Sequence, residues 1–171
     1  MTVVVGVEAP NGVWLGCDSR VSTGESLDVL RVPKWFRLGA VVLGWSGDLR
    51  ASQVALTLPP PTPRKPREPA LSYLLRAVVE PLRHHLEQRG IPWSGDWLLV
   101  SERRVYTLQA DWSIVASARG YAAVGGGAPY ALGALDALAA SAPATRVTAA
   151  LTAASAHCPF VGPPYHVLRV R

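Results

Sequence analysis

The first twenty residues decide how this chain is organised. They read MTVVVGVEAPNGVWLGCDSR (residues 1–20), with apolar runs at 3–7 and 13–17 on either side of the turn-forming stretch Ala9-Pro10-Asn11-Gly12. Asn-Gly between two β-rich runs is a strong hairpin signal, because a tight turn needs positive φ and these residues tolerate it best. The hairpin predicts that Thr2 and Asp18 lie together at its open end.

Thr2, at the open end of this hairpin, is a candidate nucleophile. Because Thr2 is small, we expect Met1 to be removed, which leaves a hydroxyl and an α-amine on one residue. An amine with an unperturbed pKa of about 8 can act as a base for that hydroxyl. A threonine hydroxyl is a weak nucleophile by itself, so we expect the ammonium of Lys34 beside it and the carboxylate of Asp18 to hold that ammonium. A retained Met1 would tie up the amine and block this activation.

The chain resembles the proteasome β-subunit family, which includes the bacterial peptidase subunit that works with a ring ATPase. The residues that carry the resemblance are Thr2, Gly6, Gly12-Val13, Asp18-Ser19-Arg20, Lys34, Gly44-Trp45-Ser46-Gly47-Asp48 and the segment GYAAVGGGAPYALGAL at 120–135. Together they span nearly the whole chain. The resemblance implies an α+β fold, the four-layer αββα sandwich of N-terminal-nucleophile hydrolases, assembled as a homo-oligomeric ring.

The resemblance implies a threonine-type endopeptidase that degrades unfolded polypeptides inside a ring chamber fed by an ATPase. Thr2, Asp18 and Lys34 are its predicted catalytic residues. We expect Gly44 to supply the oxyanion donor, because a backbone N–H in a glycine turn can face developing negative charge without obstruction. Turn formation alone also explains a glycine there, and Gly47 would serve a turn equally well. No cofactor or metal is expected.

Two positions depart from the family pattern. Gly126 stands where the family commonly has a serine near the terminal amine, and Cys158 lies where proteasomal members place an aspartate before a serine and a glycine. These departures motivate an alternative, a catalytically silent ring or scaffold subunit that kept the fold and the ion pair. A second alternative is an N-terminal-nucleophile amidase acting on a small amide. His157 or water could replace the missing groups.

Composition narrows the remaining possibilities. A chain of 171 residues fits a single domain covering 1–171, and no apolar run approaches the ~20 residues that cross a bilayer. We expect no membrane association and a cytoplasmic location. The net charge of +5 comes from scattered arginines without a nucleic-acid-binding motif, so nucleic acid is not an expected partner. Cys17 and Cys158 lack metal-ligand spacing and are expected to be buried free thiols.

The rest of the chain predicts short strands and amphipathic helices. We expect a strand near 27–30, one extended segment from Lys34 through 43, a helix at 48–56 and a long helix at 70–89 kinked by Pro81. Strands at 96–101, 104–108 and 113–116 form a second sheet, helices follow at 129–140 and 144–156, and 165–171 is the last strand. The proline-rich stretch 58–69 is extended, either as a surface loop or as a partner-contacting edge of an oligomer.

Overall fold

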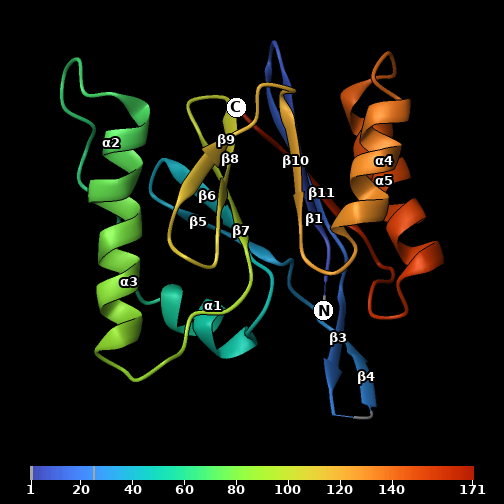
Figure 1. Cartoon of the computed structure of the whole chain (residues 1–171), viewed down its shortest axis with the longest axis horizontal. Coiled ribbons are helices and arrows are strands. Elements are labelled where there is room, and N and C mark those ends of the chain that lie inside the picture. The colour runs from blue at the N-terminus through green and yellow to red at the C-terminus, as the bar shows by residue number, and fades with distance from the viewer. Residues whose placement is uncertain (1, 25) are drawn as a thin grey trace.

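The computed structural model describes residues 2–24 and 26–171, so the predicted removal of Met1 lies outside the described residues. The protein is a mixed α/β structure with two sheets and a separate two-stranded hairpin. The first sheet has the order β10-β1-β2-β11, from β1 (Val4–Ala9), β2 (Gly12–Cys17), β10 (Tyr121–Val124) and β11 (His166–Val170), all antiparallel. Figure 1 shows the N-terminus near the lower end of this sheet.

The predicted first hairpin is confirmed, but its turn lies one residue earlier than the Asn-Gly signal indicates. Ala9 pairs with Gly12, so Pro10 and Asn11 form the two-residue loop. Of these residues only Gly12 has positive φ, at +135°, and a Cβ there would lie 2.2 Å from the Val170 carbonyl oxygen. The glycine is therefore required by the close approach of β11, which the local sequence does not reveal.

The second sheet has the order β5-β6-β7-β8-β9, formed by β5 (Trp35–Leu38), β6 (Val41–Gly44), β7 (Trp97–Ser101), β8 (Arg104–Leu108) and β9 (Ile114–Ala116). The expectation of one extended segment from Lys34 through 43 was wrong, because the chain turns at Gly39, where φ is +59°. The strand expected near 27–30 is the second half of a hairpin, β3 (Arg20–Thr23) with β4 (Ser26–Val29), which extends from the body in Figure 1.

The helices lie outside the two sheets. α1 (Leu49–Ala55), α2 (Ala70–Leu74), the π-helical turn η1 (Leu75–Val79) and α3 (Glu80–Glu87) cover the second sheet, while α4 (Ala128–Ala137) and α5 (Pro143–His157) cover the first (Figure 1). At the position of the kink expected from Pro81, the helix contains the π-helical turn η1, which directly precedes α3. Because proline has no N–H and its ring clashes with the preceding turn, a wider turn before it accommodates the residue within a continuous helix.

Three clusters of buried side chains hold these elements together. One joins the second sheet to α1–α3 around Trp97 and Leu82, one joins the first sheet to α4 and α5 around Val5 and Leu151, and one lies where the two sheets face each other, around Val4 and Leu98. The alternation of β1 explains this division, since successive side chains point to opposite faces of a sheet. Across residues 2–24 and 26–171, no helix is long and apolar enough to cross a membrane.

Candidate active site

Thr2 lies at the open end of the first hairpin, as predicted. Val4 pairs with Cys17, and the Asp18 amide donates to the Val3 carbonyl at 3.3 Å, which brings residues 2 and 18 together. The Thr2 carbonyl accepts a hydrogen bond of 3.1 Å from the Gly127 N–H, and a Cβ at Gly125 would lie 2.3 Å from that carbonyl oxygen. The glycine-rich segment therefore holds the backbone of Thr2 from the other side.

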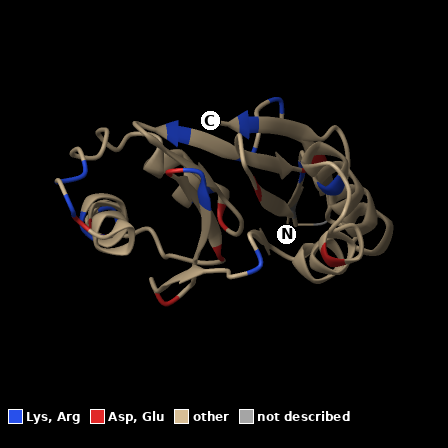
Figure 2. Ribbon diagram, turned by 90° about the horizontal axis from the view of Figure 1, so that it is seen from above, with Lys and Arg blue, Asp and Glu red and all other residues tan. Residues whose placement is uncertain are grey.

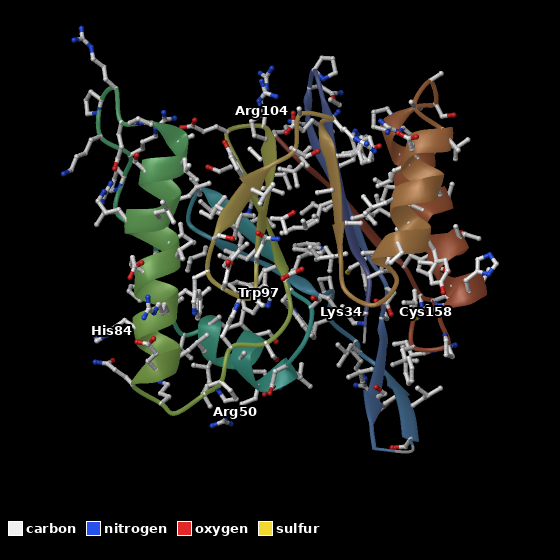
Figure 3. The ribbon with its side chains drawn as sticks, viewed as in Figure 1. Lys34, Arg50, His84, Trp97, Arg104 and Cys158 are labelled. Atoms are coloured by element: carbon white, nitrogen blue, oxygen red, sulfur yellow. The ribbon has the colours of Figure 1, made fainter. Side chains whose placement is uncertain are left out.

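The side chain of Thr2 meets the charged pair that the sequence predicts. Its hydroxyl donates to Asp18 Oδ1 at 2.5 Å and accepts a hydrogen bond from Lys34 Nζ. Lys34 Nζ lies 2.8 Å from Asp18 Oδ1 and donates to the Arg20 carbonyl at 2.5 Å. All three side chains are buried, with 3%, 0% and 1% of Thr2, Asp18 and Lys34 exposed. Lys34, labelled in Figure 3, thus reaches the start of the chain from the interior.

Burial lowers the pKa of the Lys34 ammonium, since desolvation disfavours the charged form, and the nearby Asp18 carboxylate opposes this shift. A lysine with a lowered pKa exchanges protons more readily near neutral pH than an exposed one. The geometry therefore places a group able to bias proton transfer directly on the Thr2 hydroxyl.

Asp18 is held by a loop that the sequence did not connect to the site. Its carboxylate accepts hydrogen bonds from the Val3 and Arg20 amides, at 3.0 Å each, and from the Gly162 amide at 3.3 Å. In the same loop, residues 159–164, the Pro164 carbonyl accepts a hydrogen bond of 2.6 Å from the Ser19 hydroxyl. A C-terminal segment thus fixes Asp18, and only long-range packing could reveal this.

Two cavities adjoin Thr2. One, of about 340 Å³, is lined by Thr2, Ser46, Gly47, Gly95, Asp96, Gly125 and Gly126. The other, of about 220 Å³, is lined by Thr2, Arg20, Val21, Ser22, Lys34, Trp45, Gly47, Asp48 and Leu49. Gly47 belongs to both cavities, so a chain bound across Thr2 would pass its backbone.

Gly44, the expected oxyanion donor, does not lie beside Thr2. It is paired within the second sheet with Trp35 and Leu98, and a Cβ on it would lie 2.7 Å from Val4 Cγ1. It lines neither cavity beside Thr2. Gly47 has φ of +87°, and within the described chain no carbonyl or side chain accepts a hydrogen bond from its N–H. From its sequence, Gly47 was expected only as a turn residue, and its position directly before Asp48, the cap of α1, was the signal that could have drawn attention to its N–H.

Comparison with solved structures identifies the fold. BPH of Thiobacillus denitrificans in complex with epoxomicin aligns with a TM-score of 0.78 and 19% identity over 99% of each chain. HslV of Trypanosoma brucei aligns with a TM-score of 0.76 and 18% identity over 97% of each chain, and an Anbu mutant from Hyphomicrobium sp. strain MC1 with 0.77 and 14% identity over 99% of this chain and 81% of that one. The chain has the proteasome β-subunit fold. No protein-family model and no curated protein matches it.

Within this proteasome-type fold, the two departures from the family pattern occupy different environments. Gly126 lines the larger cavity with Thr2 and presents no side chain to it. Cys158 ends α5 and packs among the apolar side chains beneath the first sheet, including Val3. His157 is exposed and stacks on Tyr130, with ring centroids 5.3 Å apart, and it lines neither cavity at Thr2. The proposal that His157 replaces a missing group thus has no geometric support.

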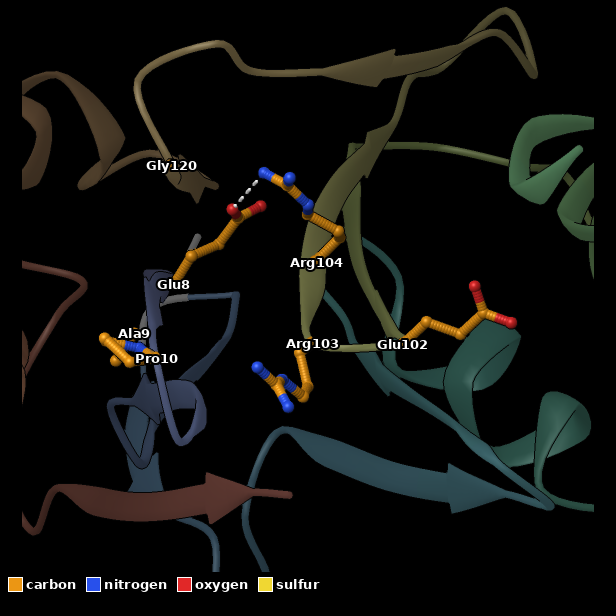
Figure 4. Close-up of a pocket in the computed structure, with 7 residues that line it drawn as sticks. All are labelled: Glu8, Ala9, Pro10, Glu102, Arg103, Arg104 and Gly120. Atoms are coloured by element: carbon orange, nitrogen blue, oxygen red, sulfur yellow. Dashed lines mark hydrogen bonds and ion pairs between the residues drawn. The ribbon is translucent and has the colours of Figure 1, made fainter.

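A third cavity, larger than these two, lies away from Thr2. It measures about 720 Å³ and lies between the β1–β2 and β7–β8 turns. Glu8 pairs with Arg104 at 2.9 Å, and Figure 4 shows this pair together with Arg103, which is directed toward Pro10. Glu102 is paired with Arg64. Figure 2 shows basic residues on several elements with acidic residues among them. Among the described residues, no three His, Cys, Asp or Glu side chains are placed to hold a metal ion.

Cys17 adjoins the site without touching the Thr2 hydroxyl. Its sulfur accepts a hydrogen bond of 3.2 Å from the Lys34 amide, and burial raises the pKa of the thiol from 9.0 to about 12. The folded thiol therefore stays protonated where the unfolded thiol ionises. Since the folded state then binds more protons, this contribution to stability is complete below pH 9 and is lost as the pH rises toward about 12.

We expect the free energy of unfolding of the wild type to fall by about 1 kcal/mol more than that of Cys17→Ala between pH 9 and about pH 10. Urea titrations at the two pH values measure this difference. Cys158→Ala, which removes the other buried cysteine, is measured in the same way for comparison. Parallel pH profiles for the wild type and Cys17→Ala would contradict the prediction.

Proposed function

We propose that this chain is the threonine-type endopeptidase subunit of a self-compartmentalised ring protease that degrades unfolded polypeptides. Thr2 acts as the N-terminal nucleophile after removal of Met1. The observation that carries the proposal is the contact of the Thr2 hydroxyl with both Lys34 Nζ and Asp18 Oδ1 in a buried cluster. A hydroxyl buried against a lysine and a carboxylate, with two cavities beside it, fits an activated nucleophile better than a structural threonine.

The chemistry follows from these positions. The Thr2 Oγ1 attacks the carbonyl carbon of a peptide bond while its proton passes to the free α-amine of Thr2. Lys34 favours the anionic oxygen by its charge and is itself held by Asp18. The proton then moves to the departing amine as the carbon–nitrogen bond breaks, leaving an ester on Thr2. A water molecule hydrolyses the ester, which releases the acid and restores the hydroxyl.

We assign the oxyanion donor to the Gly47 N–H in place of Gly44. Gly47 lines both cavities at Thr2, and its N–H makes no hydrogen bond within the described chain. A backbone N–H in this position can receive the negative charge that develops on the carbonyl oxygen. The two cavities then accommodate substrate side chains on either side of the bond to be cleaved.

The fold supports the proposed layer architecture and ring assembly. The helices outside two facing sheets accord with the four-layer αββα sandwich of N-terminal-nucleophile hydrolases. Assembly into a homo-oligomeric ring is supported by apolar side chains left exposed on and after the β3–β4 hairpin, at Leu27, Val29 and Val32. A ring ATPase is the partner that would supply unfolded chains. Native mass spectrometry tests the ring, and a monomer at micromolar concentration would count against it.

The experiment that tests the function combines mass spectrometry with an activity assay. We expect the purified protein to begin at Thr2, to cleave an unfolded polypeptide, and to gain the mass of one epoxomicin molecule on Thr2, since the similar BPH of Thiobacillus denitrificans was solved with that compound. Thr2→Ala should show neither cleavage nor labelling. Thr62→Ala, on the proline-rich segment, is the control and should keep both.

The alternatives predict other outcomes. Gly126 supplies no hydroxyl near Thr2, which favours a silent subunit as the second candidate. Intact oligomers that retain Met1, or that neither cleave nor react with epoxomicin, would replace the proposal with that candidate. Cleavage of small amides with no activity on unfolded chains would instead indicate an amidase.

A further inference from the structure

The peptide group between Ser46 and Gly47 is held in place by a hydrogen bond and by backbone packing on its interior side. The indole N–H of Trp97 donates to the Ser46 carbonyl at 3.0 Å, and Trp97 is fully buried. The Ser46 hydroxyl donates to the Asp96 carbonyl at 2.6 Å. The backbone of the same loop lies against the peptide, since a Cβ at Gly95 would be 3.0 Å from the Ser46 oxygen and 3.1 Å from the Gly47 nitrogen.

Trp97 begins β7, and the residues on either side of the indole are themselves anchored. Asp96 Oδ1 accepts a hydrogen bond of 3.0 Å from the Ala110 amide, and the ring of Trp97 packs against Trp93 at 4.8 Å and edge-on against Phe36 at 6.0 Å between centroids. The position of the indole is therefore set by the second sheet and its core (Figure 3).

The Ser46 carbonyl and the Gly47 N–H belong to one planar trans peptide group, in which the two point in opposite directions. Holding the carbonyl against the buried indole therefore turns the N–H away from the core, toward the cavities that Gly47 lines beside Thr2. Glycine at 47 permits the peptide to rotate, so without the indole the N–H is free to turn out of position. A hydrogen bond on the carbonyl also polarises the group and strengthens its N–H as a donor.

We propose that Trp97 is a positioning residue of the reaction: its indole N–H fixes the Ser46–Gly47 peptide so that the Gly47 N–H faces the substrate carbonyl oxygen. This inference rests on the proposed function and deepens it. It assigns to a buried tryptophan of the second sheet, more than ninety residues from Thr2 in sequence, a role in transition-state stabilisation as well as in packing.

Trp97→Phe removes the donor and keeps an aromatic ring. We expect kcat per folded, epoxomicin-reactive site to fall about 10- to 100-fold with KM changed by less than about 3-fold, because orientation of the donor matters mainly in the transition state. Trp97→Met provides a second variant without a donor, whose flexible side chain fills irregular space. Trp93→Phe is the matched control: it keeps an aromatic ring against Trp97 and removes only an indole N–H that donates at 3.2 Å to the Gln109 carbonyl, outside the Ser46–Gly47 peptide.

Amide hydrogen exchange provides a readout that does not require catalysis. In peptides covering residues 45–48, the amide of Trp45, which donates to the Lys34 carbonyl at 2.9 Å, should exchange faster in both Trp97 variants than in Trp93→Phe and the wild type. Unchanged kcat relative to Trp93→Phe, or unchanged exchange over 45–48, would overturn the inference. A wild type without Thr2-dependent cleavage would refute the proposed function, whereas the exchange comparison would still decide whether Trp97 holds this peptide.

Discussion

Lys34→Met is expected to lower kcat for peptide cleavage by about 10²- to 10⁴-fold while the protein stays folded. The ammonium of Lys34 is the only lysine charge on the Thr2 hydroxyl in the described chain, and it sits there with its pKa lowered by burial. Methionine has similar length and no charge. It therefore removes the proton-biasing group without opening a large cavity.

The fold should tolerate this change because Asp18 keeps its other partners. The carboxylate still accepts hydrogen bonds from the Thr2 hydroxyl and from the Val3, Arg20 and Gly162 amides. Steady-state kinetics and near-ultraviolet circular dichroism measure the two effects separately. Lys65→Met, which removes the exposed lysine of the proline-rich segment, is the control and should leave kcat within about 2-fold. An active Lys34→Met enzyme would refute the assigned role of Lys34.

Asp18→Ala is expected to impair both stability and activity, lowering the free energy of unfolding by about 3–5 kcal/mol. The substitution leaves the Lys34 ammonium buried without its counter-ion and removes the acceptor of three backbone amides. Urea denaturation followed by tryptophan fluorescence measures the loss.

Two comparisons isolate the cause of that loss. Asp28→Ala removes an exposed carboxylate that accepts a hydrogen bond from the next amide, and it should change stability by less than about 1 kcal/mol. The double variant Asp18→Ala/Lys34→Met should be more stable than Asp18→Ala, because it no longer buries an unpaired charge. Strict additivity of the two single substitutions would contradict the coupling.

The pairing of Thr2 with Asp18 was predictable because a hairpin relates residues at its open end by simple register. Apolar runs and the periodicity of apolar residues also located most of the strands and helices, and the helix expected at 48–56 is α1, which Asp48 caps. The contact of Lys34 with Thr2 agrees with the prediction from the resemblance to proteasome β subunits. The assignment of these residues to catalysis stays a proposal.

The glycine motif was not sufficient to choose the residue that we propose as the oxyanion donor. Gly44 and Gly47 both fit a glycine turn in the sequence, but Gly44 is paired inside the second sheet whereas Gly47 faces both cavities at Thr2. A difference of three residues changes which backbone N–H lies at the cavities beside Thr2. That choice depends on where β6 ends, which is the least predictable feature of a strand.

By itself, the sequence determined the first hairpin and the meeting of Thr2 with Asp18 at its open end, because a single turn sets the register of residues that are near each other in the chain. The place of Lys34 beside Thr2 was expected from its charge and from the resemblance to proteasome β subunits. Only the tertiary structure decided that the loop at 159–164 holds Asp18, that β11 requires glycine at position 12, and that Trp97 grips the Ser46–Gly47 peptide. These contacts join segments from about fifty to more than 140 residues apart, and no local pattern encodes them.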